Sequence, residues 1–155
     1  MVAAWVVELF ESVLKDHVEL SYFVPLLIGH GGNTGAQSNA SIIRALALGQ
    51  LRPSDYFMVV RKEASAGFLM GCLLGALIFG LSFLWRGLPT AVALTVAISL
   101  PVVSVWANLL GGAFPLLSVY FGKNPAVTSA PLMTTVVDAT GLAIYLWIGK
   151  LIIGI

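Results

Sequence analysis

The placement of charged side chains constrains this chain more than any other feature. Residues 64–85 and 87–122 contain no Asp, Glu, Lys or Arg, and residues 124–149 contain only Asp138. A helix of about 20 apolar residues crosses the hydrocarbon core of a bilayer, so each of these three runs is long enough to span it. The chain is 59% hydrophobic and 10% charged, whereas soluble domains carry about 25% charged residues. The sequence therefore predicts an integral membrane protein.

A fourth run, residues 20–48, also has spanning length, although it contains the polar stretch GHGGNTGAQS and Arg44. Pro101 and Pro115 lie inside the run 87–122 and favour one bent helix over two separate spans. In the run 64–85 small residues recur every four positions and predict a face on which another helix packs closely in lipid: Gly67, Gly71 and Gly75.

The apolar segment at the N-terminus is too short to cross a bilayer. Residues 2–10 are apolar apart from Glu8, and charges recur among apolar residues up to Glu19. This pattern indicates a partial first span that runs into an amphipathic interfacial helix. The expected fold is an all-α polytopic membrane helix bundle with four full spans, this partial span and the interfacial helix. The cluster Arg52, Arg61 and Lys62 is expected on the cytoplasmic side.

Asp138 is the first candidate functional residue, because it falls near the middle of the last span. A carboxylate at that depth costs at least about 2.5–3.5 kcal/mol on insertion scales and normally faces a cavity, a partner or an ion. On a helix its face would also carry small or polar residues and one aromatic: Pro131, Thr134, Thr135, Gly141 and Tyr145. An ion pathway is therefore expected. The structural alternatives are an interhelical ion pair or a protonated acid bonded to Asn108.

Two further polar stripes accompany Asp138. Asn108 lies on a stripe with small residues and prolines, and Asn33 lies on one with Gln37 and Ser41. Each stripe suits either a pore wall or hydrogen-bonded packing between helices.

The glycines of GHGGNTGAQS disfavour regular helix, because each costs about 1 kcal/mol relative to alanine. We therefore expect a helix break at His30-Gly31-Gly32, buried or lining a wet cavity, where the carbonyl of Gly29 could face a cation. His30 itself is expected to be a packed, neutral imidazole. Carboxylate and carbonyl oxygens with water suit hard cations such as Mg²⁺.

Several other classes of function are excluded or disfavoured. A net charge of +1 does not provide the basic surface that nucleic acid requires. Cys72 is the only cysteine, so no disulfide forms within the chain and no cysteine-rich zinc site exists. No arrangement typical of nucleophilic or zinc-dependent catalysis occurs, and the protein is not expected to be an enzyme.

The segment PLLIGHGGNTGAQSNASIIRALALGQL, residues 25–51, resembles the signature of the MgtE/SLC41 family of magnesium transporters. Three other segments resemble the same family in sequence order: FESVLKD at 10–16, WANLLGGAFPLL at 106–117 and NPAVTSAPLMTTVVDATGLAIYL at 124–146. Together they cover nearly the whole chain, and the combination of GGNTGAQS with TTVVDATG is specific.

The resemblance implies a homodimer with five spans per subunit and a Mg²⁺ pore along the dimer axis. By this mapping Asp138 would hold the ion, Gly29 would offer a backbone oxygen, and Asn33 would lie near the pore. Thr134 would contribute backbone and side-chain oxygens. Ala130 replaces an asparagine of some members, so it would offer only its carbonyl. Asn108, Gln37, Pro131 and Gly141 are expected to line the pore.

The expected function is a Mg²⁺-permeable channel or transporter in a cell membrane, with the ion held largely through water. Exchange of Mg²⁺ for Na⁺, transport of Mn²⁺ or Ca²⁺, and a non-conducting subunit that needs a separate gating partner remain alternatives. Residues 1–155 are expected to form one transmembrane ion-pore domain with an incomplete first span. Members usually carry cytoplasmic N and CBS domains, which these residues do not include, so a Mg²⁺-sensing domain or subunit is an expected partner beside the lipid bilayer.

Overall fold

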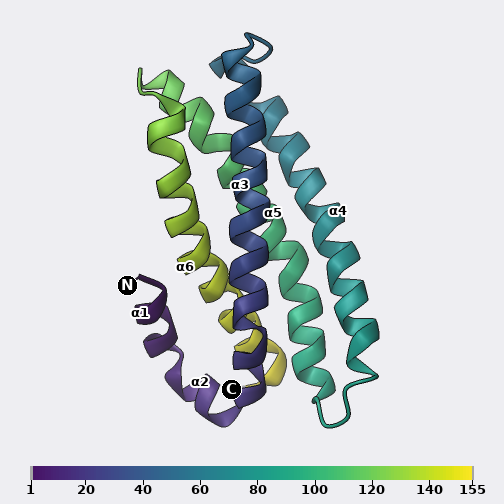
Figure 1. Cartoon of the computed structure of the whole chain (residues 1–155). Coiled ribbons are helices and arrows are strands. Elements are labelled where there is room, and N and C mark those ends of the chain that lie inside the picture. Colours follow the sequence, from purple (N-terminus) through teal and green to yellow (C-terminus); the bar gives the residue numbers. More distant parts are fainter. Residues whose placement is uncertain (1, 155) are drawn as a thin grey trace.

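The structure, a computed structural model, describes residues 2–154. Its elements are all helical within that range: α1 (Val2–Leu9), α2 (Glu11–Asp16), the 3₁₀ helix η1 (Val18–Phe23), α3 (Val24–Ala47), the 3₁₀ helix η2 (Pro53–Asp55), α4 (Tyr56–Ser82), α5 (Thr90–Tyr120) and α6 (Pro125–Ile153). The four long helices α3 to α6 stand side by side, while α1 and α2 fold back beside the lower part of α6 (Figure 1). The predicted all-α class is confirmed.

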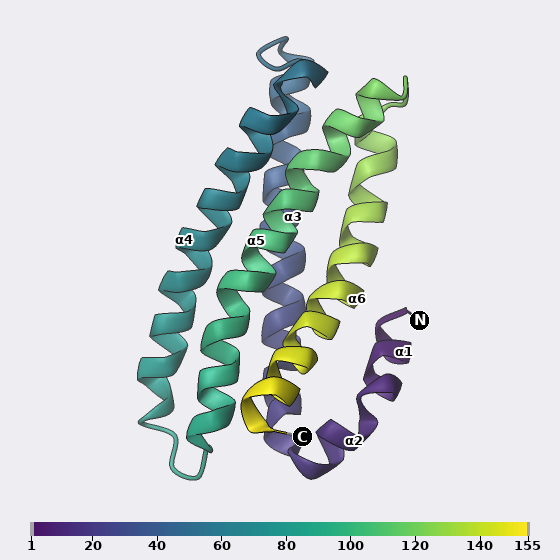
Figure 2. The ribbon, with the colours of Figure 1, turned by 180° about the vertical axis from the view of Figure 1, so that it is seen from behind.

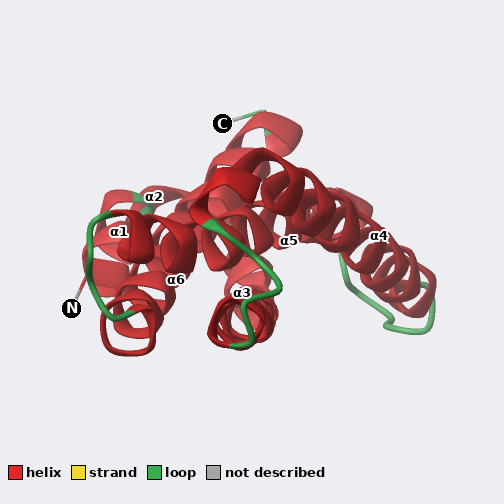
Figure 3. Cartoon of the chain, turned by 90° about the horizontal axis from the view of Figure 1, so that it is seen from above, coloured by secondary structure: helices red, strands yellow, loops and turns green. Residues whose placement is uncertain are grey.

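Helix α5 is the centre of the bundle. It packs against α3, α4 and α6, and it lies between α4 and α6 when the molecule is seen from behind (Figure 2). The view from above places α4 at one edge and α3 beside α5 and α6 (Figure 3). The buried core follows this arrangement and consists mainly of aliphatic side chains from α5 and α6: Val96, Leu100, Val103, Leu142 and Leu146.

The ends of α6 follow directly from the sequence. Asn124 precedes the helix, and its side-chain oxygen accepts a hydrogen bond from the Ala126 N–H at 3.0 Å. Pro125 occupies the first turn, where its missing N–H removes no helical bond. Gly154 ends the helix with a φ of 83°, a left-handed conformation that glycine adopts without strain. Tyr145 then fixes α6 to η1, because its hydroxyl donates to the Leu20 carbonyl at 2.9 Å.

The small-residue ridge of α4 packs closely on another helix, as predicted, and its partner is α5 around Pro101. Pro101 has no N–H to give to the Ala97 carbonyl one turn earlier. Gly75 lies against that carbonyl, so closely that a methyl group added to the glycine would come within 2.5 Å of the oxygen. Gly71 lies directly on the Pro101 backbone. The run 87–122 therefore forms one helix that includes both prolines, also as predicted.

Within residues 2–154, three helices are long and apolar enough to cross a membrane: Pro53–Ser82, Thr90–Tyr120 and Pro125–Ile153. Helix α3 has 24 residues and matches the fourth predicted span in position, but its polar residues leave it outside that group. A count of four full spans therefore stays a prediction. The helix that contains most of the run 64–85, α4, begins earlier than predicted, at Tyr56, because it continues through the charged residues Arg61, Lys62 and Glu63.

The expected helix break at His30-Gly31-Gly32 is wrong, because α3 is continuous from Val24 to Ala47. Packing explains the difference. Gly31 is buried against Val103 of α5 and Val137 of α6, and Gly35 lies against the Ala107 carbonyl. The glycines allow three helices to approach closely, and this burial outweighs the low helix propensity of glycine.

Candidate cation site

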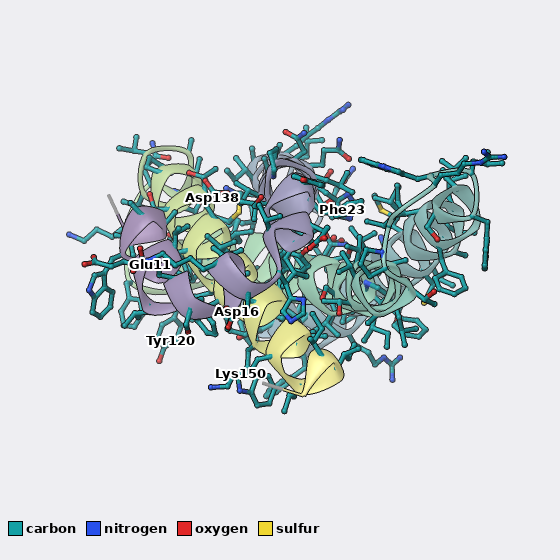
Figure 4. The ribbon with its side chains drawn as sticks, turned by 90° about the horizontal axis from the view of Figure 1, so that it is seen from below. Glu11, Asp16, Phe23, Tyr120, Asp138 and Lys150 are labelled. Carbon is teal, nitrogen blue, oxygen red and sulfur yellow. The ribbon has the colours of Figure 1, made fainter. Side chains whose placement is uncertain are left out.

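Asp138 lies on α6 where that helix meets α3 (Figure 4). Its carboxylate rests against Gly32, where a methyl group would come within 3.1 Å of Asp138 Oδ1. The side chain is partly exposed. Among residues 2–154 the recorded ion pair joins Lys15 to Glu11, so Asp138 has no ion-pair partner there. The predicted alternative of an interhelical ion pair is therefore wrong for the described part of the chain.

The outward side of α3 beside Asp138 is polar and uncovered. Gly29, Asn33 and Gln37 follow one another at four-residue steps and are all exposed. Because Gly32 contacts Asp138, this face of α3 borders the carboxylate. The α3 residues that the resemblance assigns to the site, Gly29 and Asn33, thus lie on the exposed face of α3 that adjoins Gly32.

The outward side of α6 continues the same surface. Ala130, Pro131 and Thr135 are exposed, and Thr134 is partly exposed. The hydroxyl of Thr134 donates to the carbonyls of Ala130 and Pro131 at 3.3 and 3.2 Å, and that of Thr135 donates to Pro131 at 3.0 Å. Each hydroxyl proton is thus used within the helix, which leaves the hydroxyl oxygen as an acceptor toward the outside. We call the exposed residues Gly29, Asn33, Gln37, Ala130, Pro131 and Thr135, together with Thr134 and Asp138, the α3–α6 polar face.

The remaining residues of the predicted Asp138 face point elsewhere. Gly141 is buried, with Val103 beside its α-carbon, and Tyr145 is buried at the contact with η1. The pore-lining role given to Gly141 stays a prediction.

Asn108 lies inside the bundle rather than on the polar face. Its Nδ2 donates to the Glu63 carbonyl at 3.1 Å, and its own carbonyl accepts a bond from Ser38 Oγ at 3.3 Å. It therefore joins α3, α4 and α5, which is the packing role that the sequence offered as an alternative. The alternative of a protonated Asp138 bonded to Asn108 is wrong for residues 2–154, where the bonds of Asn108 run to Glu63 and Ser38 and none joins it to Asp138. Its pore-lining role stays a prediction.

His30 is the packed imidazole that was expected. Its Nε2 lies 2.7 Å from Ser104 Oγ, and Ser104 donates its own proton to the Leu100 carbonyl at 2.6 Å. Since that hydroxyl proton is already used, Nε2 carries hydrogen and donates to Ser104. Nδ1 lies 3.5 Å from Thr34 Oγ1, and in a neutral ring it would accept that hydroxyl proton.

Sequence reasoning missed two features that position the site. Gly32 is the surface on which the Asp138 carboxylate rests, and its place in the GGN motif was the available signal. Asn39 is buried, and its Oδ1 accepts a bond from Ser129 Oγ at 2.9 Å. This bond fixes α3 to α6 about two turns from Asp138, but two distant polar residues within apolar runs do not reveal their pairing. No cluster of three metal-ligating His, Cys, Asp or Glu side chains occurs among residues 2–154.

Comparison with known families places the chain in one of them. The family model for MgtE, described as a divalent cation transporter, matches residues 24–148, which include both helices of the polar face. The chain belongs to the MgtE family. The resemblance found in the sequence is thereby confirmed.

Three bacterial relatives are each named magnesium transporter MgtE. The protein of Thermus thermophilus is 41% identical over 153 residues, which are 99% of this chain and 34% of the relative. Those of Enterococcus faecalis and Bacillus subtilis are 32% and 30% identical, over 94% of this chain and 32% of each relative. The chain thus spans about a third of the length of these relatives. With the three apolar helices, these relatives support a multi-pass integral protein of the plasma membrane.

Proposed function

We propose that this chain forms the pathway by which a MgtE family transporter moves Mg²⁺ across the membrane, with Asp138 as the ion-holding carboxylate. The observation that carries the proposal is the position of Asp138. It lies on the exposed α3–α6 polar face, without an ion-pair partner among residues 2–154, in a helix that is long and apolar enough to cross a bilayer. A carboxylate is expensive at such depth unless it meets water, an ion or a partner.

The ligands available at this face favour a cation that keeps most of its water. One carboxylate is accompanied only by neutral oxygens, from the hydroxyl of Thr134, the carbonyls of Ala130 and Gly29, and the amide of Asn33. Mg²⁺ dehydrates reluctantly and is commonly bound through one or two carboxylates with several waters retained. Asp138 would therefore hold the ion largely through water.

A second copy of the chain is the proposed cover of the polar face. Polar side chains and the carboxylate would otherwise meet lipid, where unsatisfied polar groups each cost several kcal/mol. Two copies facing each other would place two Asp138 carboxylates across a shared, wet axis, and a divalent cation between them would relieve their repulsion. Gln37 and Pro131 would then line the path. Homodimerisation is thus part of the proposal.

Mg²⁺ uptake into liposomes that contain the purified chain tests this function. Asp138→Asn keeps the shape of the side chain and removes its charge, so we expect uptake to fall about tenfold or more, since a charged ligand contributes about 1.5–3 kcal/mol. Glu8→Gln changes an exposed carboxylate of α1 and should leave uptake unchanged. Equal uptake by wild type and Asp138→Asn would remove the basis of the proposal.

The same assay separates the alternatives. Uptake that requires an opposing Na⁺ gradient would indicate exchange, and uptake of Mn²⁺ or Ca²⁺ at equal rates would indicate a broader divalent-cation transporter. Absence of uptake by the wild-type chain would favour a membrane subunit that conducts only with a partner.

A further inference from the structure

A second polar pocket lies on the opposite side of α3 from the Asp138 contact. It has a volume of about 150 Å³ and lies between α3, α4 and α5. Six of its eight lining residues carry an oxygen-bearing side chain: Thr34, Gln37, Ser38, Ser41, Glu63 and Asn108. One water needs only about 10–15 Å³ of cavity, so the pocket has room for an ion and several waters.

Glu63 supplies the pocket's carboxylate. The side chain lies over Gly112 of α5, where an added methyl group would come within 3.1 Å of Glu63 Cγ. Glu63 is partly exposed and lines the pocket, whereas its neighbours Arg61 and Lys62 are exposed. No lysine or arginine among residues 2–154 forms an ion pair with it.

The backbone around Glu63 is fixed by the pocket itself. Asn108 Nδ2 donates to the Glu63 carbonyl at 3.1 Å, and Ser38 Oγ donates to the Asn108 carbonyl at 3.3 Å. The amide nitrogen of Asn108 is thus already used. What the pocket can offer to a ligand is mainly acceptor oxygen, from the carboxylate of Glu63 and the amide and hydroxyl groups of Gln37 and Ser41.

The pocket is displaced from Asp138 along the axis of α3. Gln37 and Ser41 lie five and nine residues after Gly32, which corresponds to about 8–14 Å at 1.5 Å per residue of helix. The displacement leads toward the end of α3, which carries Arg44, and the start of α4, which carries Arg61. Arg52 lies in the connection between these ends, which is the side expected in the cytoplasm. Gln37 belongs both to this pocket and to the α3–α6 polar face.

We infer that the pocket between α3, α4 and α5 binds a partly hydrated hard metal cation, Mg²⁺ or Na⁺, with Glu63 as its single charged ligand. Oxygen-only donors with one carboxylate select hard cations over transition metals. An unpaired carboxylate that lines a pocket at the edge of an apolar span is stabilised by such an ion. This site is separate from Asp138, so it can be absent while the proposed transport function stands.

Cation-dependent thermal stability of the purified chain in detergent tests the inference. An ion that binds only the folded protein raises the unfolding temperature. In Asp138→Asn, where the carboxylate of the α3–α6 polar face is removed, MgCl₂ or NaCl should still raise that temperature at constant ionic strength. When Glu63→Gln is added to Asp138→Asn, the cation concentration that produces half of the rise in unfolding temperature should increase about tenfold or more. Comparison of the two salts identifies the ion.

Two variants separate binding from general damage. Ala66→Leu keeps Glu63 but fills the pocket, because Ala66 lines it, and should weaken the same shift. Glu8→Gln removes an exposed carboxylate of α1 and should not. If Glu63→Gln lowers the stability of the ion-free protein, the response of Ala66→Leu to the salts decides whether the cation binds in this pocket. An Asp138→Asn protein that responds to neither salt, or one whose response survives both pocket variants, would overturn the inference.

Discussion

At the scale of single residues, the candidate site depends on how closely α6 approaches α3. The Asp138 carboxylate rests against Gly32, where the first carbon of a side chain would come within 3.1 Å of Oδ1 and make the carboxylate shift. Asp138 is partly exposed at the edge of the α3–α6 polar face. The identity of one small residue thus determines where the charge is placed.

Gly32→Val tests this dependence. The first carbon of the new side chain would lie 3.1 Å from Asp138 Oδ1, so the carboxylate must move. We expect Mg²⁺ uptake into liposomes to fall about fivefold, which corresponds to about 1 kcal/mol of ion binding. Gly80→Val is the matched control, because nothing lies within 4 Å of the added carbon there. Unchanged uptake by Gly32→Val would show that the contact does not position the carboxylate.

At the scale of helices, the sequence predicted most of what the structure shows. Charge-free runs located α5 and α6, the ridge that includes Gly71 predicted a closely packed face on α4, and Pro125 with Asn124 marked the start of α6. These features depend on local composition or on one helix face, which a sequence displays directly. The break expected near Gly31 was wrong, because its cause is tertiary: three helices meet there, and propensity alone does not register their packing.

The candidate site was predictable only in part, for the same reason. The lone charge of a long apolar run drew attention to Asp138, and the helical period placed Thr134 and Pro131 near it. That Asn108 bonds to α4, and that Gly141 is buried, depends on which neighbour each face of α5 and α6 meets. The sequence of one helix does not contain this information.

Gly71→Val tests the packing of α4 on α5. The added atoms would overlap the backbone of Leu100 and Pro101, where no flexible side chain can move aside. We expect a loss of about 1–3 kcal/mol in the free energy of unfolding, typical of overpacking. Thermal unfolding in detergent measures it, with Gly80→Val on the same helix as control. Equal stability of the two variants would contradict the close contact.

At the scale of the whole molecule, the bundle has two unlike outer surfaces. Helix α4 presents exposed apolar side chains such as Leu73 and Leu77, which suit contact with lipid. The α3–α6 polar face does not suit lipid, and its proposed cover is a second copy of the chain. The difference predicts which surface lies between subunits.

Cross-linking distinguishes the two surfaces. In a Cys72→Ser background, Thr135→Cys introduces a single thiol on the polar face, and Leu73→Cys introduces one on the apolar surface. We expect a flexible bismaleimide to link Thr135→Cys into dimers in membranes and to leave Leu73→Cys largely monomeric. The reverse pattern, or equal linkage, would show that the polar face is not the subunit interface.

The central claim is that the side chain at position 138 faces water, and its accessibility to an aqueous reagent tests that most directly. Thiolates react with membrane-impermeant, charged methanethiosulfonates only where water reaches them. In the Cys72→Ser background, Asp138→Cys should react much faster than Leu73→Cys, whose position is 74% exposed but lies on the apolar surface. Labelling at position 138 as slow as at position 73 would contradict the account.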